Sequence, residues 1–185
     1  MIFLVTGGAA SGKSEYAEKL ACRLSAIDGG TLIYLATMQP AGDPETAARI
    51  RRHQALRAGK GFRTVERCRD LSGAQVPGQS VVLLECLMNL AANEMFAPDG
   101  NSDLAFDRIC AGLAHLAEQS RHLIVVSGDL FSDGAVYSPE TEAYRCLLAR
   151  LHTWLAARAE IREIVCGLVG TPPQTPSGGC SPPEP

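Results

Sequence analysis

The sequence lacks an excess of basic residues, a membrane-length apolar run and a charged leader, and each absence excludes a class of protein. With 17 Lys and Arg against 20 Asp and Glu, the formal net charge is −3, so no overall positive field favours nucleic-acid binding. No apolar run reaches the roughly 20 residues of a membrane-spanning helix. No basic region precedes the short apolar stretch at the N-terminus, so we expect no secretory signal. We therefore expect a cytoplasmic protein without nucleic-acid partners or a membrane span.

Cysteine pairs are also missing. The seven cysteines are scattered singly, and none of them forms a C-x-x-C pair. An odd number of isolated cysteines argues against both a disulfide framework and a zinc site. We expect most of them to be small buried side chains in a reducing compartment.

The chain does contain short apolar runs that alternate with amphipathic stretches. Its 185 residues, 46% apolar and 20% charged, suit a globular protein with one substantial core. The predicted strands cover residues 1–6, 31–37, 62–66, 79–85, 122–127 and 163–169. The predicted helices cover residues 15–24, 44–59, 87–96, 103–120 and 139–159. This alternation predicts an α/β fold with a mostly parallel sheet and helices on both faces.

The composition changes near the C-terminus. Residues 171–185 are rich in Pro, Gly and Ser, and such a segment buries too little apolar surface to fold. We predict a single catalytic domain at residues 1–170 and a disordered tail at residues 171–185.

Residues 7–14 read G-G-A-A-S-G-K-S and match the phosphate-binding loop pattern G-x-x-x-x-G-K-[ST]. Glycines let successive N–H groups point at phosphate oxygens, and the following helix directs its positive end at the same anion. Lys13 is the expected catalytic cation at the β- and γ-phosphates, and the Ser14 hydroxyl is an expected Mg²⁺ ligand. The predicted strand before the loop and the helix after it argue against a chance glycine-rich turn. The predicted nucleotide-binding residues here are Gly7, Gly8, Ala9, Ala10, Ser11, Gly12, Lys13 and Ser14.

Glu85 is the second candidate, because it closes the strongly apolar strand predicted at residues 79–85. Phosphate sites in parallel α/β sheets lie beyond the carboxyl ends of the strands. Glu85 is therefore expected beside Ser14, where a Walker B-like carboxylate would hold Mg²⁺ or its water. The alternative is a surface acid at the point where the strand leaves the core.

His53 is the third candidate, in the helix predicted at residues 44–59. That helix also carries Arg49, Arg51, Arg52 and Arg57. Helical spacing puts Arg49 and His53 on one face, where a neutral imidazole among arginines can act as a nucleophile or a phosphate ligand. The alternative is a solvated cationic face whose histidine does no chemistry. We assign no chemistry to His115, His122 and His152.

These motifs belong to a longer pattern that resembles the bifunctional adenosylcobinamide kinase / adenosylcobinamide-phosphate guanylyltransferase family of cobalamin biosynthesis. The similarity begins with L-V-T-G-G-A-A-S-G-K-S at residues 4–14 and extends to about Gly170. The sequence A-R-I-R-R-H at residues 48–53 is similar to the family's R-I-x-x-H, and L-L-E-C-L at residues 83–87 to its acid-bearing strand. A P-loop combined with these two motifs is much more specific than a P-loop alone.

The resemblance implies a P-loop NTPase (RecA-like) fold and two reactions. ATP or GTP phosphorylates adenosylcobinamide; His53 then carries GMP covalently and passes it to adenosylcobinamide phosphate, giving adenosylcobinamide-GDP. Mg²⁺ is the implied cofactor, held by Ser14 and Glu85, and the implied substrates are ATP, GTP and the corrinoid. Arg49 and Glu66 join the implied nucleotide-binding residues. Family members tend to form trimers, so the resemblance also implies a homo-oligomer.

Two segments depart from the family pattern. In place of N-E-V-G after the strand predicted at residues 122–127, the chain has S-G-D-L-F at residues 127–131. In place of G-x-x-N-Q it has A-R-L-H-T at residues 149–153. Two other functions therefore stay open: a P-loop kinase for another small molecule that does not use His53, and a non-enzymatic nucleotide-binding protein that has lost its activity.

Overall fold

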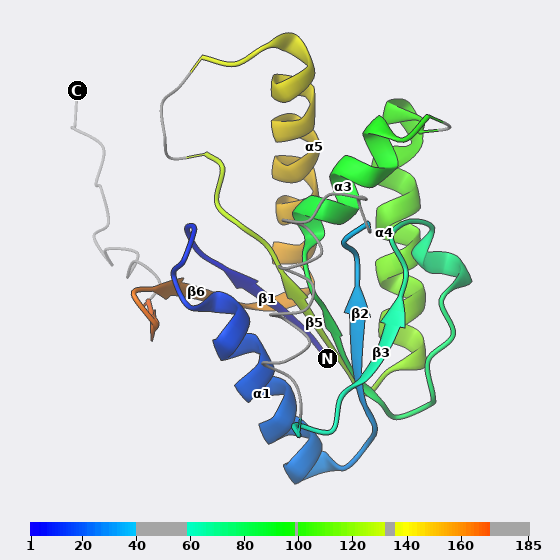
Figure 1. The fold of residues 1–185 in the computed structure, drawn as a ribbon, viewed down its shortest axis with the longest axis vertical. Helices are drawn as coiled ribbons and strands as arrows, with labels where there is room; N and C mark the ends of the chain where they lie inside the picture. Colours follow the sequence, from blue (N-terminus) through cyan, green and yellow to red (C-terminus); the bar gives the residue numbers. More distant parts are fainter. Residues whose placement is uncertain (40–58, 99, 132–135, 171–185) are drawn as a thin grey trace, which may run out of the picture.

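The structure is a computed structural model that describes residues 1–39, 59–98, 100–131 and 136–170 (Figure 1). Its strands are β1 (Ile2–Thr6), β2 (Leu32–Ala36), β3 (Arg63–Glu66), β4 (Val81–Leu84), β5 (His122–Val126), β6 (Ala159–Val165) and β7 (Leu168–Val169). They form one sheet in the order β3-β2-β4-β5-β1-β6-β7. Neighbouring strands pair in parallel, except for the antiparallel pair of β6 and β7. The predicted α/β class with a mostly parallel sheet is confirmed.

The described helices are α1 (Lys13–Asp28), α3 (Leu87–Phe96), α4 (Ser102–Gln119) and α5 (Pro139–Ala156), with a short 3₁₀ turn at Leu71–Gly73. One buried cluster joins α1 to one face of the sheet, where Phe3 and Val5 of β1 point. The second and larger cluster joins α3, α4 and α5 to the other face, where Leu4 points. Successive strand side chains face opposite sides, so β1 contributes to both cores. Figure 1 shows α1 on one side of the sheet and the other three helices on the opposite side.

The central strands are buried on both faces, which explains why they are continuous apolar runs in the sequence. All four residues of β4 are buried, and so are the middle three of β1 and of β2. Helix starts follow local capping chemistry. The Asn101 side chain accepts hydrogen bonds from Asp103 N (3.0 Å) and Leu104 N (3.2 Å) at the start of α4, and Ser138 with Pro139 begins α5.

The C-terminal part of the sheet differs from the prediction. The helix predicted to reach residue 159 ends at Ala156, and the single strand predicted at residues 163–169 is a hairpin of β6 and β7. Cys166 (φ 49°) and Gly167 (φ 79°) form its turn, and left-handed residues at both central positions match the twist of a two-residue hairpin. The prediction missed the first four residues of β6, whose sequence A-E-I-R is charged because this strand lies close to the sheet edge and exposes much of its length.

The prediction that most cysteines are buried is wrong for the part of the chain that the structure describes. Only Cys110 is buried there, whereas Cys146 and Cys166 are exposed and three others are half-buried. Local roles explain two of these positions. The Cys86 sulfur caps α3 by accepting a hydrogen bond from Asn89 N at 3.4 Å, and Cys166 lies in the hairpin turn. None of the six described cysteines forms a disulfide.

Several expectations concern residues outside the described ranges. They include most of the predicted helix at residues 44–59, with Arg49 and His53, and the tail at residues 171–185. The described strands, from residue 2 to residue 169, share one sheet, and the domain boundary at residue 170 stays a prediction. Within the described ranges, no helix combines the length and apolar character that crossing a bilayer requires.

Candidate nucleotide-binding site

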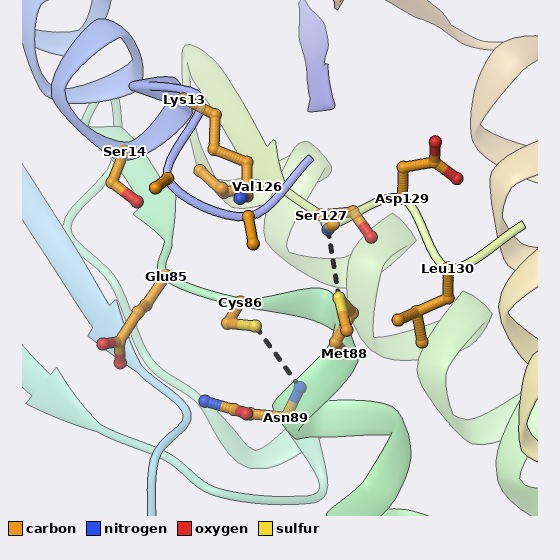
Figure 2. A pocket seen from close by; sticks show the side chains of 13 residues that line it. Lys13, Ser14, Glu85, Cys86, Met88, Asn89, Val126, Ser127, Asp129 and Leu130 are labelled. Carbon is orange, nitrogen blue, oxygen red and sulfur yellow. Dashed lines mark hydrogen bonds between the residues drawn. The ribbon is translucent and has the colours of Figure 1, made fainter. Parts of the chain in front are cut away.

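Because β1, β4 and β5 run in parallel, the residues that follow them meet at one edge of the sheet. A cavity of about 400 Å³ opens there (Figure 2). The loop after β1 and the first turn of α1 contribute Ala9, Ala10, Lys13 and Ser14. The segment after β4 contributes Glu85, Cys86, Met88 and Asn89. Val126, the last residue of β5, and the four residues after it complete the lining. The structure thus brings the phosphate loop and Glu85 to one cavity, as the sequence predicts.

The loop at residues 7–14 has the backbone that its glycines were expected to permit. Gly7 (φ 153°) and Gly12 (φ 90°) adopt conformations that favour glycine, and Gly12 leads directly into α1. The first helical bond joins Tyr16 N to Gly12 O at 3.0 Å, so the positive end of α1 lies at the loop. Lys13 folds over the loop, where its Nζ donates to Gly8 O at 2.9 Å. The start of α1 and the Lys13 side chain therefore lie at the cavity wall, where an anion would be favoured.

The hairpin of β6 and β7 supports this loop from outside. Gly167 N donates to Ser11 O at 2.7 Å, which ties the loop to the hairpin turn. A Cβ on Gly7 would lie 2.4 Å from Ile164 O and a Cβ on Gly12 would lie 3.2 Å from Gly167 Cα, so both glycines are also needed for close packing. On the other side, Asp129 N donates to Gly7 O at 3.2 Å. Sequence reasoning missed this support, because it predicted one strand at residues 163–169 where the chain forms a hairpin.

Glu85 follows β4 and is half-buried. Its Oε2 accepts a hydrogen bond from Thr37 N at 3.3 Å, and Thr37 is fully buried at the end of β2. The Thr37 hydroxyl donates to Cys86 O at 3.0 Å. The Asn93 amide of α3 donates to Thr37 O at 2.8 Å and to Cys68 O at 3.0 Å. Glu85 is therefore held in a network that ties together the carboxyl ends of β2, β3 and β4.

A serine–histidine pair borders the same cavity, and sequence reasoning missed it. Ser127 directly follows β5 and is fully buried, and its Oγ lies 2.7 Å from Nε2 of His152 in α5. The Phe131 ring packs edge-on against the imidazole, with 5.6 Å between ring centroids. Burial lowers the pKa of His152 below its ordinary value, and the nearby Asp129 carboxylate opposes that shift. No local motif marks the pair, because its members lie on elements that meet only in the folded chain.

Other predicted site residues lie elsewhere. Glu66 ends the edge strand β3, with β2, β4 and β5 between it and β1, and it does not line the cavity described above. Its predicted role in nucleotide binding stays a prediction. Arg49 and His53 lie outside the described residues. Lys60 lies just after that segment in the sequence. Its Nζ forms an ion pair with Oε2 of Glu18 in α1, at 2.5 Å.

A strand, a phosphate-binding loop and a helix that begins at the loop's lysine, with an acid at the end of a nearby parallel strand, define a protein of the P-loop class. The family model described as "Cobinamide kinase / cobinamide phosphate guanyltransferase" matches residues 3–172. The chain belongs to this family, which confirms the predicted resemblance.

Three curated relatives agree with this assignment. The chain is similar to the bifunctional adenosylcobalamin biosynthesis protein CobU of Escherichia coli (strain K12), with 42% identity over 106 residues, covering 56% of this chain and 55% of that protein. CobU of Salmonella typhimurium (strain LT2), with the same descriptive name, is 40% identical over 106 residues, with the same two coverages. The bifunctional adenosylcobalamin biosynthesis protein CobP of Pseudomonas aeruginosa (strain PAO1) is 36% identical over 99 residues, or 52% of this chain and 54% of that protein. The chain spans about half the length of the curated relatives it matches.

Proposed function

We propose that this chain is a transferase of cobalamin biosynthesis that acts on a corrinoid alcohol in two reactions. In the first, ATP or GTP donates its γ-phosphoryl group to the hydroxyl group of adenosylcobinamide. In the second, GTP donates GMP to His53, and the guanylyl group passes to the phosphorylated corrinoid to give adenosylcobinamide-GDP. The observation that carries the proposal is the phosphate loop at the cavity, in a chain whose family is named for both activities.

The arrangement of charge supports phosphoryl transfer. The loop amides, the start of α1 and Lys13 offer positive charge on one wall of the cavity, where the phosphate chain would lie. During transfer, the bond between the attacking oxygen and the γ-phosphorus forms while the bond to the leaving β-phosphate oxygen breaks. Negative charge on the transferred oxygens is then stabilised by groups that are already in place, which is how P-loop proteins accelerate this reaction.

Ser14 and Glu85 supply donors that fit Mg²⁺. Both line the cavity, and both present oxygen atoms, which this hard cation prefers. Mg²⁺ in such sites uses one or two protein ligands together with substrate phosphates and water. We therefore assign the metal to Ser14, Glu85 and the nucleotide. Bound there, Mg²⁺ would offset phosphate charge.

Two contacts support the proposed role of His53 in guanylyl transfer. The chain enters residues 40–58 from the end of β2, where Thr37 is tied to Glu85 and Cys86. It leaves them near Lys60, which is paired with Glu18, one helical turn after Ser14. Described residues on both sides of the segment that carries His53 and Arg49 therefore contact Glu85 or a residue one helical turn from Ser14. A neutral His53 imidazole would attack the α-phosphorus of GTP and expel pyrophosphate, with Arg49 binding phosphate oxygens.

Turnover of adenosylcobinamide with ATP and Mg²⁺ tests the first reaction. We expect formation of the phosphorylated corrinoid and its loss in Lys13→Ala, with Lys19→Ala as the control, since Lys19 lies exposed on the same helix and pairs with Glu15. Phosphorylation of another small molecule in place of the corrinoid would support the alternative kinase. No nucleotide turnover at all would support the non-enzymatic alternative. We also propose that the protein is cytoplasmic and forms a homo-trimer. Light scattering of the purified chain measures its molar mass and tests the trimer.

A further inference from the structure

A second, smaller cavity lies next to the nucleotide site, between the start of α1 and the sheet. Its volume is about 10 Å³, close to what one water molecule needs. It is lined by Ser14, Glu18, Tyr34, Leu83, Glu85 and Val126. Ser14 and Glu85, the candidate metal ligands, also line the larger cavity (Figure 2). An occupant of the small cavity would therefore contact both residues to which we assign the metal.

Glu18 is the carboxylate that the small cavity adds to this site. It lies one helical turn after Ser14, on the same face of α1. Its side chain is only 7% exposed, and its Oε2 pairs with Lys60 Nζ at 2.5 Å. Among the residues that the structure describes, its Oε1 has no hydrogen-bond or ion-pair partner. A carboxylate that is almost fully buried needs partners for both of its oxygens, and the cavity that Glu18 lines offers room for one.

The hydrogen bonds of the two carboxylates decide which occupant fits the small cavity. Glu18 accepts from Lys60 Nζ, and Glu85 accepts from Thr37 N. An ionised carboxylate can only accept, so an occupant between these two side chains must donate. A water molecule bound to a cation is suited to this, because its lone pair faces the cation and both of its protons can be donated. Mg²⁺ bound through one or two protein ligands and phosphates keeps several such waters.

We propose that Glu18 accepts a hydrogen bond from a water molecule of the Mg²⁺ ion that Ser14 and Glu85 would bind, and that it is a positioning residue of this metal site. The inference rests on the proposed metal–nucleotide site and adds to it a carboxylate that contacts the metal only through water. Lys60 offsets the charge of Glu18, which lets two carboxylates line one small cavity. Residues that hold the groups around a metal in this way contribute about 10- to 100-fold to metal affinity.

Three substitutions separate this role from a plain ion pair and from the overall charge of α1. Glu18→Gln keeps the size of the side chain and removes its charge. Lys60→Met breaks the ion pair and leaves the Glu18 carboxylate in place. Glu15→Gln removes a charge from the first turn of the same helix, where Glu15 is exposed and pairs with Lys19. Circular dichroism checks that each variant folds.

Binding of a non-hydrolysable ATP analogue tests the proposal without turnover and without a corrinoid. Titration calorimetry with Mg²⁺ and again with EDTA gives the gain in affinity that the metal provides. We expect Glu18→Gln to lower this gain about tenfold, with the affinity in EDTA within about twofold of wild type. Glu15→Gln should match the wild type. Lys60→Met should gain at least as much as the wild type, because the Glu18 carboxylate remains and a competing cation is lost.

The possible results distinguish this inference from the function on which it rests. A wild-type gain in Glu18→Gln would overturn the role of Glu18 and leave the proposed nucleotide site intact. Equal losses in Glu18→Gln and Lys60→Met would also overturn it, because a plain ion pair predicts them. So would an equal loss in Glu15→Gln, which would assign the effect to the charge of the helix. A wild type that gains nothing from Mg²⁺ would contradict the proposed metal site itself, and the role of Glu18 with it.

Discussion

Glu85 illustrates how one residue depends on its neighbours at the end of a strand. Its backbone N–H donates to Leu35 O at 3.0 Å, and its carboxylate accepts from Thr37 N, so main chain and side chain are both tied to β2. The carboxylate makes this contact while lining the same cavity as Ser14. Its place is therefore fixed by the strand pairing of β2 and β4, and its negative charge remains available to a cation.

We expect Glu85→Gln to lower nucleotide turnover about 100-fold, because the amide keeps an oxygen for Thr37 N but loses the charge that would hold Mg²⁺. A Mg²⁺ titration of turnover measures the effect and should show a weaker apparent affinity for the metal. Glu118→Gln, on the exposed face of α4, is the matched control and should behave as wild type. An unchanged Mg²⁺ dependence in Glu85→Gln would remove Glu85 from the metal site.

His152 predicts a dependence of stability on pH. Burial lowers its pKa, against the pull of Asp129, so the folded chain binds fewer protons than the unfolded chain between that lowered pKa and the ordinary value of about 6.5. The stability that this provides is fully present above about pH 6.5 and is lost as the pH falls through 6.5 towards the lowered pKa. Urea unfolding at about pH 7.5 and 5.5 should show a larger loss in wild type than in His152→Gln. Equal losses in both proteins would contradict the assigned shift.

At the scale of elements, the phosphate loop is shaped by the hairpin of β6 and β7 as well as by its own glycines. Ile164 O lies where a side chain on Gly7 would have to go, and Gly167 N holds Ser11 O. Gly8 differs, because it has no positive φ and no atom within 4 Å of an added Cβ. The two neighbouring glycines therefore form a matched pair for mutation.

We expect Gly7→Ala to weaken ATP binding at least about tenfold, because the clash with Ile164 O must displace the loop or β6. Gly8→Ala should bind within about twofold of wild type, because its Cβ meets open space. Titration calorimetry with ATP and Mg²⁺ measures both, and circular dichroism checks that both variants fold. Wild-type affinity in Gly7→Ala would show that the hairpin does not set the shape of the loop.

The carboxyl ends of β2 and β3 depend on one amide of α3. Asn93→Asp removes the donors to Thr37 O and Cys68 O and brings a negative charge to both carbonyl oxygens. We expect the free energy of unfolding to fall by about 2–3 kcal/mol, and by less in Asn93→Ala, where water can reach the two carbonyls. Urea denaturation measures both values. A smaller loss for Asp than for Ala would contradict the assigned donor role.

At the scale of the whole molecule, burial decides which parts of the fold could be predicted from the sequence. The strands β1, β2, β4 and β5 are buried on both faces and stand out as short apolar runs, and their parallel pairing follows from the helices between them. Residues 159–162 at the start of β6 carry no such signal, and the hairpin of β6 and β7 was predicted as one strand. The hairpin also rests on a turn that begins at Cys166, a residue type that gives no indication of a turn.

The site divides in the same way. The phosphate loop was predictable because its motif consists of consecutive residues. Glu85 was predictable because it ends an apolar strand, and the carboxyl ends of parallel strands lie at one edge of the sheet. The contacts of Ser127 with His152, and of Asn93 with Thr37 and Cys68, were not, because they join residues at least 25 positions apart. Such pairs depend on the packing of α3 and α5 over the sheet, which periodicity does not specify.

The whole account depends most on His53 carrying the guanylyl group, and labelling with GTP tests this most directly. The protein is incubated with α-³²P-labelled GTP and Mg²⁺, denatured and examined for covalent label. We expect an adduct that is labile in acid and stable in alkali, as a phosphoramidate should be, and that is absent in His53→Asn and kept in His115→Asn. No adduct in the wild type, or label that persists in His53→Asn, would contradict the account.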